Sequence, residues 1–134
     1  MARTTKQRLQ DAHAAIAAIQ RYVPTEALER LNDDLTRSAV ERQLSIVREA
    51  LRVALLQDPI LRHRWPELEA AMARCDRLRD WENPVEVQAL AECVEGDLQD
   101  WQAMIAALLK QQQEEGARLD QRIVENQRRL GYGF

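Results

Sequence analysis

The sequence predicts an all-α fold, an up-and-down helical bundle of four main helices plus a short helix. Among its 134 residues are only four glycines and four prolines, and aromatic residues make up 4%. Alanine, leucine, arginine, glutamine and glutamate dominate, which is typical of helices rather than sheets. Apolar residues recur three and four positions apart along most of the chain, as on one face of an amphipathic helix. At this length, we expect one domain with one core.

Two long helices are predicted in the first half of the chain. Thr4 and Gln7 have capping-box spacing, and Pro24 ends the helix that follows. A short helical turn over residues 25–31 leads to polar acceptors that can start the second long helix, which Pro59 closes. Helices joined this closely should lie antiparallel. Their apolar stripes are Leu9, Ala12, Ile16, Ile19 and Val23 in the first, and Val40, Leu44, Val47, Leu51 and Leu55 in the second.

Two more helices are predicted in the second half. Pro66 suits the first position of a third helix, and Asn83 with Pro84 suits the start of a fourth. Gly96 and Asp97 are expected to kink or restart that fourth helix. The apolar stripes are Leu68, Met72, Cys75 and Leu78 in the third helix, and Val87, Leu90, Val94, Leu98, Trp101, Ile105 and Leu108 in the fourth.

The C-terminal segment differs from the rest in composition. From Lys110 onward the residues are too polar to form secure core, although a few apolar positions could extend the last stripe. We therefore expect residues 1–109 to form the bundle and residues 110–134 to form a tail that is either helical or disordered.

Charge and cysteine usage restrict the class of protein. The 22 acidic and 19 basic residues are mixed along the chain, so no global field would attract nucleic acid or an acidic membrane. No apolar run reaches membrane-spanning length. Cys75 and Cys93 occupy apolar positions of helical patterns, which indicates reduced core thiols rather than a disulfide or a metal site. The sequence predicts a cytoplasmic protein with no membrane anchor, no metal and no cofactor.

Motifs of known catalytic chemistry are sparse. The chain has no Gly-rich phosphate loop and no zinc-type helix with paired histidines, and its only histidines are His13 and His63. His13 lies beside the first apolar stripe and is interpreted as a surface or half-buried helix residue. His63 stands in a predicted loop, residues 61–65, where a solvated basic turn is one interpretation. The other is a functional site, because the loop adds positive charge near the arginines of the third helix.

Three stretches of sequence resemble HepT-like proteins of the HEPN superfamily. Residues 36–50, TRSAVERQLSIVREA, are similar to the family's second helix, with its Ala-Val start, Leu-Ile-Ile core and Gly-Glu-Ala end. Residues 64–68, RWPEL, resemble the family's Tyr-Pro start of the third helix, with the Trp displaced. Residues 96–98, GDL, resemble its Asn-Asp-Leu. The resemblance covers most of residues 8–109.

This resemblance implies a helical bundle that forms a homodimer, with a metal-independent ribonuclease site in the dimer cleft. The family's site uses an Arg followed a few residues later by a His. These residues supply a cation for the phosphate charge and a base for the 2′-hydroxyl. Family members act as toxins, and a nucleotidyltransferase antitoxin silences them by modifying a Tyr two residues after the His. RNA and a nucleotidyltransferase-like antitoxin are therefore the implied partners.

In this chain the family motif is degenerate. Arg74 matches the motif Arg, whereas Cys75 replaces the usual Asn, Arg79 the His and Trp81 the modified Tyr. A guanidinium stays protonated at any working pH, so Arg79 cannot act as the base. We therefore expect no ribonuclease activity, although substitution of the base by another residue keeps the question of an enzyme open.

The arginines of the third helix have two interpretations. As a remnant of the family's cleft, Arg74, Arg77 and Arg79, together with His63, would bind RNA without cutting it. As a solvated helix face, the same arginines would pair with acids at helical spacing on their own helix. Those acids are Glu67, Glu69, Asp76 and Asp80.

Three functions follow from these residues. The first is a HepT-like protein of toxin–antitoxin type with a degenerate ribonuclease site, acting by RNA or protein binding. The second is an active endoribonuclease toxin that uses a non-standard base such as His63. The third is a purely structural dimerisation module. Trp81 and Trp101 are the expected interface residues, because aromatic residues often anchor interfaces.

Overall fold

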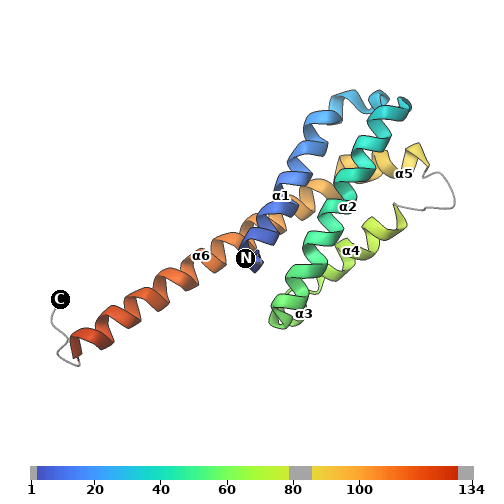
Figure 1. Cartoon of the computed structure of the whole chain (residues 1–134). Coiled ribbons are helices and arrows are strands. Elements are labelled where there is room, and N and C mark those ends of the chain that lie inside the picture. The colour runs from blue at the N-terminus through green and yellow to red at the C-terminus, as the bar shows by residue number, and fades with distance from the viewer. Residues whose placement is uncertain (1–2, 79–85, 130–134) are drawn as a thin grey trace.

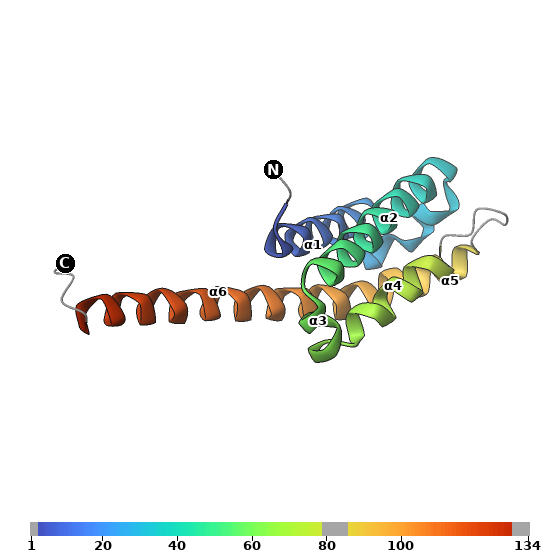
Figure 2. The ribbon, with the colours of Figure 1, turned by 60° about the horizontal axis from the view of Figure 1, so that its bottom comes forward.

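The computed structural model describes residues 3–78 and 86–129, and within these residues it contains helices and no strands. The predicted all-α fold is confirmed. In chain order the elements are α1 (Thr5–Tyr22), the 3-10 helix η1 (Thr25–Asn32), α2 (Asp34–Gln57), α3 (Pro59–Arg64), α4 (Glu67–Arg77), α5 (Val87–Glu92), the π-helix η2 (Cys93–Asp97) and α6 (Leu98–Arg129). Figures 1 and 2 show the other helices gathered around the first part of α6, while its remainder extends away from them. None of the helices in the described part is long and apolar enough to cross a membrane.

Side chains cap both long N-terminal helices, as the sequence predicts. The Thr4 hydroxyl accepts a hydrogen bond from the backbone N of Gln7 at 3.1 Å, and the Gln7 side-chain oxygen accepts one from the backbone N of Thr4 at 2.8 Å. At the start of α2, the Asp33 carboxylate accepts hydrogen bonds from the backbone N and the hydroxyl of Thr36, both at 2.9 Å. These bonds favour the charged carboxylate and so lower the pKa of Asp33. The caps satisfy N–H groups that have no partner inside the helix and fix where each helix begins.

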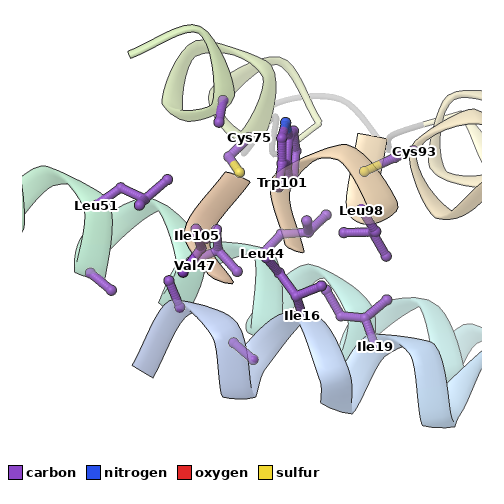
Figure 3. Packing of buried hydrophobic residues seen from close by; sticks show 14 of the residues in the cluster. Ile16, Ile19, Leu44, Val47, Leu51, Cys75, Cys93, Leu98, Trp101 and Ile105 are labelled. Atoms are coloured by element: carbon purple, nitrogen blue, oxygen red, sulfur yellow. The ribbon is translucent and has the colours of Figure 1, made fainter. Parts of the chain in front are cut away.

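The core forms where α4 and the start of α6 pack against the antiparallel pair of α1 and α2 (Figure 1). Every member of the predicted stripes of α1 and α2 is buried. In the two later stripes only Met72 and Val87 are half-buried, and all other members are buried. Figure 3 shows these side chains meeting in one cluster that includes Ile16, Leu44 and Ile105. The apolar periodicity alone therefore identified most of this core, and the buried residues outside the stripes are mainly alanines.

The segment between α2 and α4 differs from the prediction. α2 ends just before Pro59, as expected, but Pro59 is then the first residue of α3, and residues predicted as a solvated loop are helical as far as Arg64. Proline suits this position because the N–H that it lacks would have no partner in the first turn. Leu61 is buried and anchors the short helix to the core. His63 is therefore exposed on a helix and not in a loop.

A π-helical turn interrupts the predicted fourth helix. α5 passes into η2, in which hydrogen bonds span one residue more than in an α-helix, and α6 begins at Leu98. Gly96 lies in this turn, with nothing within 4 Å of the position that a Cβ would take. The kink predicted at Gly96 and Asp97 is thus a change of helix type. The predicted helix start at Asn83 and Pro84 lies outside the described residues.

Helix α6 is 32 residues long and continues through Lys110 as far as Arg129. Its first turns carry buried side chains as far as Leu108. From residue 113 to residue 126, every side chain that the structure describes is exposed. The part of α6 from residue 110 onward, called the α6 arm below, therefore leaves the bundle, as Figure 2 shows.

Candidate functional site

Arg74, which the sequence resemblance matches to the motif Arg, contacts the π-helical turn. It lies in the last turn of α4, and its Nε donates a hydrogen bond to Oδ2 of Asp97 at 2.9 Å. The two side chains are 27% and 34% exposed, so solvent partly screens the pair. The hydrogen bond from the guanidinium to Asp97 raises the pKa of Arg74, although burial opposes this shift. The contact ties the end of α4 to the turn from which α6 starts.

A shallow hollow of about 610 Å³ surrounds Arg74. Residues of α4 line one side of it, and η2 and the first turns of α6 line another. Two of its charged lining residues are arginines and three are acids. With acids in the majority, the hollow lacks the excess of positive charge that binds phosphate groups. The charged residues are Arg74, Arg77, Glu67, Asp97 and Asp100.

Among the described residues that line this hollow there is no histidine. His63 is exposed on α3, before the start of α4, whereas Arg74 lies near the end of α4. His13 is half-buried on α1, as predicted. A general base has to lie within hydrogen-bond reach of the proton that it takes. Outside the described residues lie three residues that the sequence singles out, Arg79, Asp80 and Trp81.

The two cysteines are buried free thiols, and the prediction that both are packed in the core is confirmed. Figure 3 shows the sulfur of Cys75 directed from α4 into the core. Burial is the main reason that the pKa of Cys75 and that of Cys93 are each raised to about 12. At neutral pH both are therefore protonated and unreactive. At the position that the resemblance matches to an Asn, Cys75 offers no amide group to a substrate.

One of the two interpretations of the α4 arginines was pairing with acids of their own helix, and for Arg74 the structure shows a different partner. Arg74 pairs with η2 instead, and Asp76 accepts a hydrogen bond from Nε of Arg48 on α2 at 2.7 Å. Glu69 pairs with Arg62 on α3. The charged groups of α4 therefore connect it to three neighbouring elements, because α4 lies between them and their side chains are within reach.

Trp101, predicted as an interface residue, packs against the chain's own core and is only 7% exposed (Figure 3). Among the described residues, the large apolar side chains that are exposed lie elsewhere, and those more than half exposed are Leu35, Leu56, Ile60, Leu119 and Ile123. Leu119 and Ile123 are among the positions that the sequence offered as an extension of the last stripe. The other three were not predicted, although they stand at positions that continue or flank apolar stripes.

Comparison of the chain with protein-family models, with curated proteins and with solved structures finds no match. The resemblance to HepT-like proteins therefore depends on the quoted stretches of sequence. From the sequence, Asp97 was expected to kink or restart a helix and was not expected to contact Arg74, although it lies inside one of those stretches. Its contact with Arg74 is a long-range pairing that no local pattern encodes.

Proposed function

We propose that this protein is a HepT-like helical protein of toxin–antitoxin type whose ribonuclease site is degenerate and which acts by binding another protein. The contact between Arg74 and Asp97 carries the proposal. Arg74 stands at the position of the motif Arg, and Asp97 belongs to the stretch that resembles the family's Asn-Asp-Leu. Two separate parts of the resemblance meet at 2.9 Å, which supports a HepT-like arrangement of the helices.

The surroundings of Arg74 argue against cleavage of RNA. Its guanidinium is already bound to a carboxylate, and acids outnumber bases in the hollow around it. The described lining residues include no imidazole that could take a proton from a 2′-hydroxyl. An acidic replacement would be repelled by the phosphate of the substrate.

A protein partner fits the surface better than RNA does. Affinity for RNA depends on positive charge, whereas the net charge of the chain is -3. Its surface instead exposes large apolar side chains, among them Leu35 at 81% and Leu56 at 63%. Burial of such side chains favours association with a protein surface and gives nothing to a phosphate backbone. The resemblance implies a nucleotidyltransferase-like antitoxin as the class of partner.

An RNA cleavage assay with a restored motif tests this proposal. The unmodified chain should not cleave a single-stranded oligoribonucleotide above background, because loss of positioned acid–base catalysis costs on the order of a hundred- to ten-thousandfold in rate. Arg79→His returns an imidazole to the motif position and should produce cleavage. That activity should disappear again in the Arg74→Ala/Arg79→His double variant. Arg77→His is the matched control, since it adds an imidazole to α4 away from the motif position and should stay inactive.

Three outcomes would contradict the proposal. Cleavage by the unmodified chain that His63→Ala abolishes would favour an active endoribonuclease. A folded but inactive Arg79→His variant, with helical content unchanged by circular dichroism, would remove the family's site from the proposal. Salt-sensitive RNA binding that Arg74→Ala and Arg77→Ala both weaken would favour RNA over protein as the partner.

A further inference from the structure

The α6 arm carries an apolar stripe that nothing in the single chain covers. Leu119 and Ile123 are 57% and 54% exposed and lie four residues apart. They continue the same side of the helix on which Ile105 and Leu108 are buried in the bundle. In proteins most of the stability of a helix comes from packing of its amphipathic face rather than from the helix alone. The stripe therefore indicates that another surface packs against the arm.

A groove lies between α3 and the arm, with apolar residues on both of its walls. It has a volume of about 460 Å³. Ile60 and Trp65 line it on the side of α3, and Leu108 and Leu119 line it on the side of α6. Ile60 is 61% exposed. A helix placed in this groove would contact apolar side chains of both elements.

Gly116 leaves a notch in the arm, on the side of the helix that carries Leu119 and Ile123. It lies three residues before Leu119 in the interior of an α-helix, where glycine is less favourable than alanine. Nothing lies within 4 Å of the position that a Cβ would take, so the space beside it is open. A large side chain of a second helix could occupy that space without displacing any atom of this chain.

Charges beside the stripe are complementary only to an antiparallel copy of the arm. Glu115 precedes Leu119 by four residues and Arg122 follows it by three, so both flank the stripe. If Leu119 of each copy packs against Gly116 of the other, Glu115 of each copy faces Arg122 of the other, and symmetry makes this pair twice. In a parallel pair this flank would instead face the opposite flank of the other copy, which brings Glu115 to position 120, another acidic residue in the sequence.

One contact within the chain competes with this arrangement. Oε1 of Glu115 lies 3.6 Å from Nη1 of Arg64, and the two side chains are 57% and 62% exposed. A pair this exposed and this long contributes little. Glu115 can keep Arg64 on one side and accept a second cation on the other, since a carboxylate has two oxygens.

We propose that the groove between α3 and the α6 arm receives the α6 arm of a second copy, running antiparallel, in a twofold dimer. The pairing covers Leu119, Ile123 and Ile60 in both copies at once. It does not rest on the proposed function, because it needs neither RNA nor an antitoxin. It also differs from an interface built on Trp81 or Trp101.

Sedimentation equilibrium over the micromolar range tests the dimer and its register. The unmodified chain should associate to twice its mass of 15.5 kDa. Leu119→Arg and Ile60→Arg should each raise the dissociation constant by tenfold or more. Glu115→Arg should raise it on the order of tenfold, because two attractive pairs become repulsive. The double variant Glu115→Arg/Arg122→Glu restores opposite charges across the interface and should return the constant to within about threefold of the original.

Two matched variants separate the interface from local effects. Glu114→Arg makes the same charge change one residue earlier. Position 114 lies about 100° around the helix axis from position 115, on the side away from Leu119, so this variant should leave the dissociation constant unchanged. Arg64→Gln removes the contact with Glu115 inside the chain, and its dissociation constant should stay within about threefold of that of the unmodified chain. Circular dichroism at high concentration verifies that each variant is folded.

Engineered cysteines test the orientation. In the proposed register Gln112 of one copy lies opposite Ile123 of the other, so a mixture of Gln112→Cys and Ile123→Cys chains should form a mixed disulfide on mild oxidation. Gln112→Cys chains alone should not crosslink, because their thiols lie about 16 Å apart along the helix axis. A monomer at all concentrations, a Glu115→Arg dimer that is not weakened, or a double variant that is not restored would overturn the proposal. Ready crosslinking of Gln112→Cys chains alone would overturn it as well.

Discussion

Arg48 on α2 and Asp76 on α4 lie 2.7 Å apart, from Nε to Oδ1, in the same kind of contact that Arg74 and Asp97 make at 2.9 Å. The two pairs differ in exposure. The side chains are 31% and 54% exposed in the first pair, and 27% and 34% exposed in the second. Because solvent and salt screen an exposed pair more, the pair of Arg74 and Asp97 should be coupled more strongly.

Double-mutant cycles on the free energy of unfolding test this order. We expect a coupling energy of up to about 1 kcal/mol for Arg74 with Asp97, and below about 0.5 kcal/mol for Arg48 with Asp76. The variants are the single and double alanine substitutions, unfolded in urea and followed by circular dichroism. The reverse order would show that exposure does not govern the strength of these contacts.

The two buried thiols should react slowly and should make the fold sensitive to alkali. A thiol reagent should label Cys75 and Cys93 slowly in the native protein and fast in denaturant. Folding raises the pKa of both from 9.0 to about 12, so their contribution to stability is complete below pH 9 and is lost as the pH rises toward 12. Between pH 9 and pH 12, the free energy of unfolding should fall less steeply in the Cys75→Ala/Cys93→Ala variant than in the unmodified chain. Fast native labelling of Cys75 would contradict its place in the core.

The cap at Asp33 should respond to acid. Hydrogen bonds from Thr36 lower the pKa of Asp33 from 3.8, so its contribution is present above that value and is lost as the pH falls through the lower folded pKa. Asp33→Asn keeps an acceptor at the cap but does not titrate. It should therefore match the unmodified chain at pH 7 and show a flatter loss of stability below pH 4, whereas Asp33→Ala should be less stable at pH 7. Equal stability of all three chains at pH 7 would mean that this cap does not limit α2.

Local sequence predicted most of the fold because caps and apolar periodicity act over a few residues. Thr4 and Asp33 start their helices as expected, and the predicted stripes fill the core. The prediction of a loop after Pro59 was wrong, because proline is compatible both with ending one helix and with beginning the next, and here it begins α3. The π-helical form of the turn at Gly96 was not predicted, because it depends on contacts with other elements, such as the contact of Asp97 with Arg74 on α4.

The surroundings of Arg74 were less predictable than the fold. An arginine on a helix surface can reach acids on its own helix or on any neighbour, and sequence spacing favours the first choice. The structure brings Asp97 to Arg74 from 23 residues away, which depends on how α4 and η2 pack. Exposure of Leu119, in contrast, agrees with the polar composition of residues 110–134, although its stripe is continuous with buried positions.

The π-helical turn at residues 93–97 also sets the rotational phase of everything that follows it. A π-turn holds one residue more than the α-helical turn that it replaces, so the same residues wound as a regular α-helix would rotate α6 by about 100° relative to α5. With α5 held in place, the side of α6 that carries Trp101, Ile105 and Leu119 would then face another direction. A single inserted residue thus determines the direction in which a 32-residue helix presents its apolar side, over a length of roughly 48 Å.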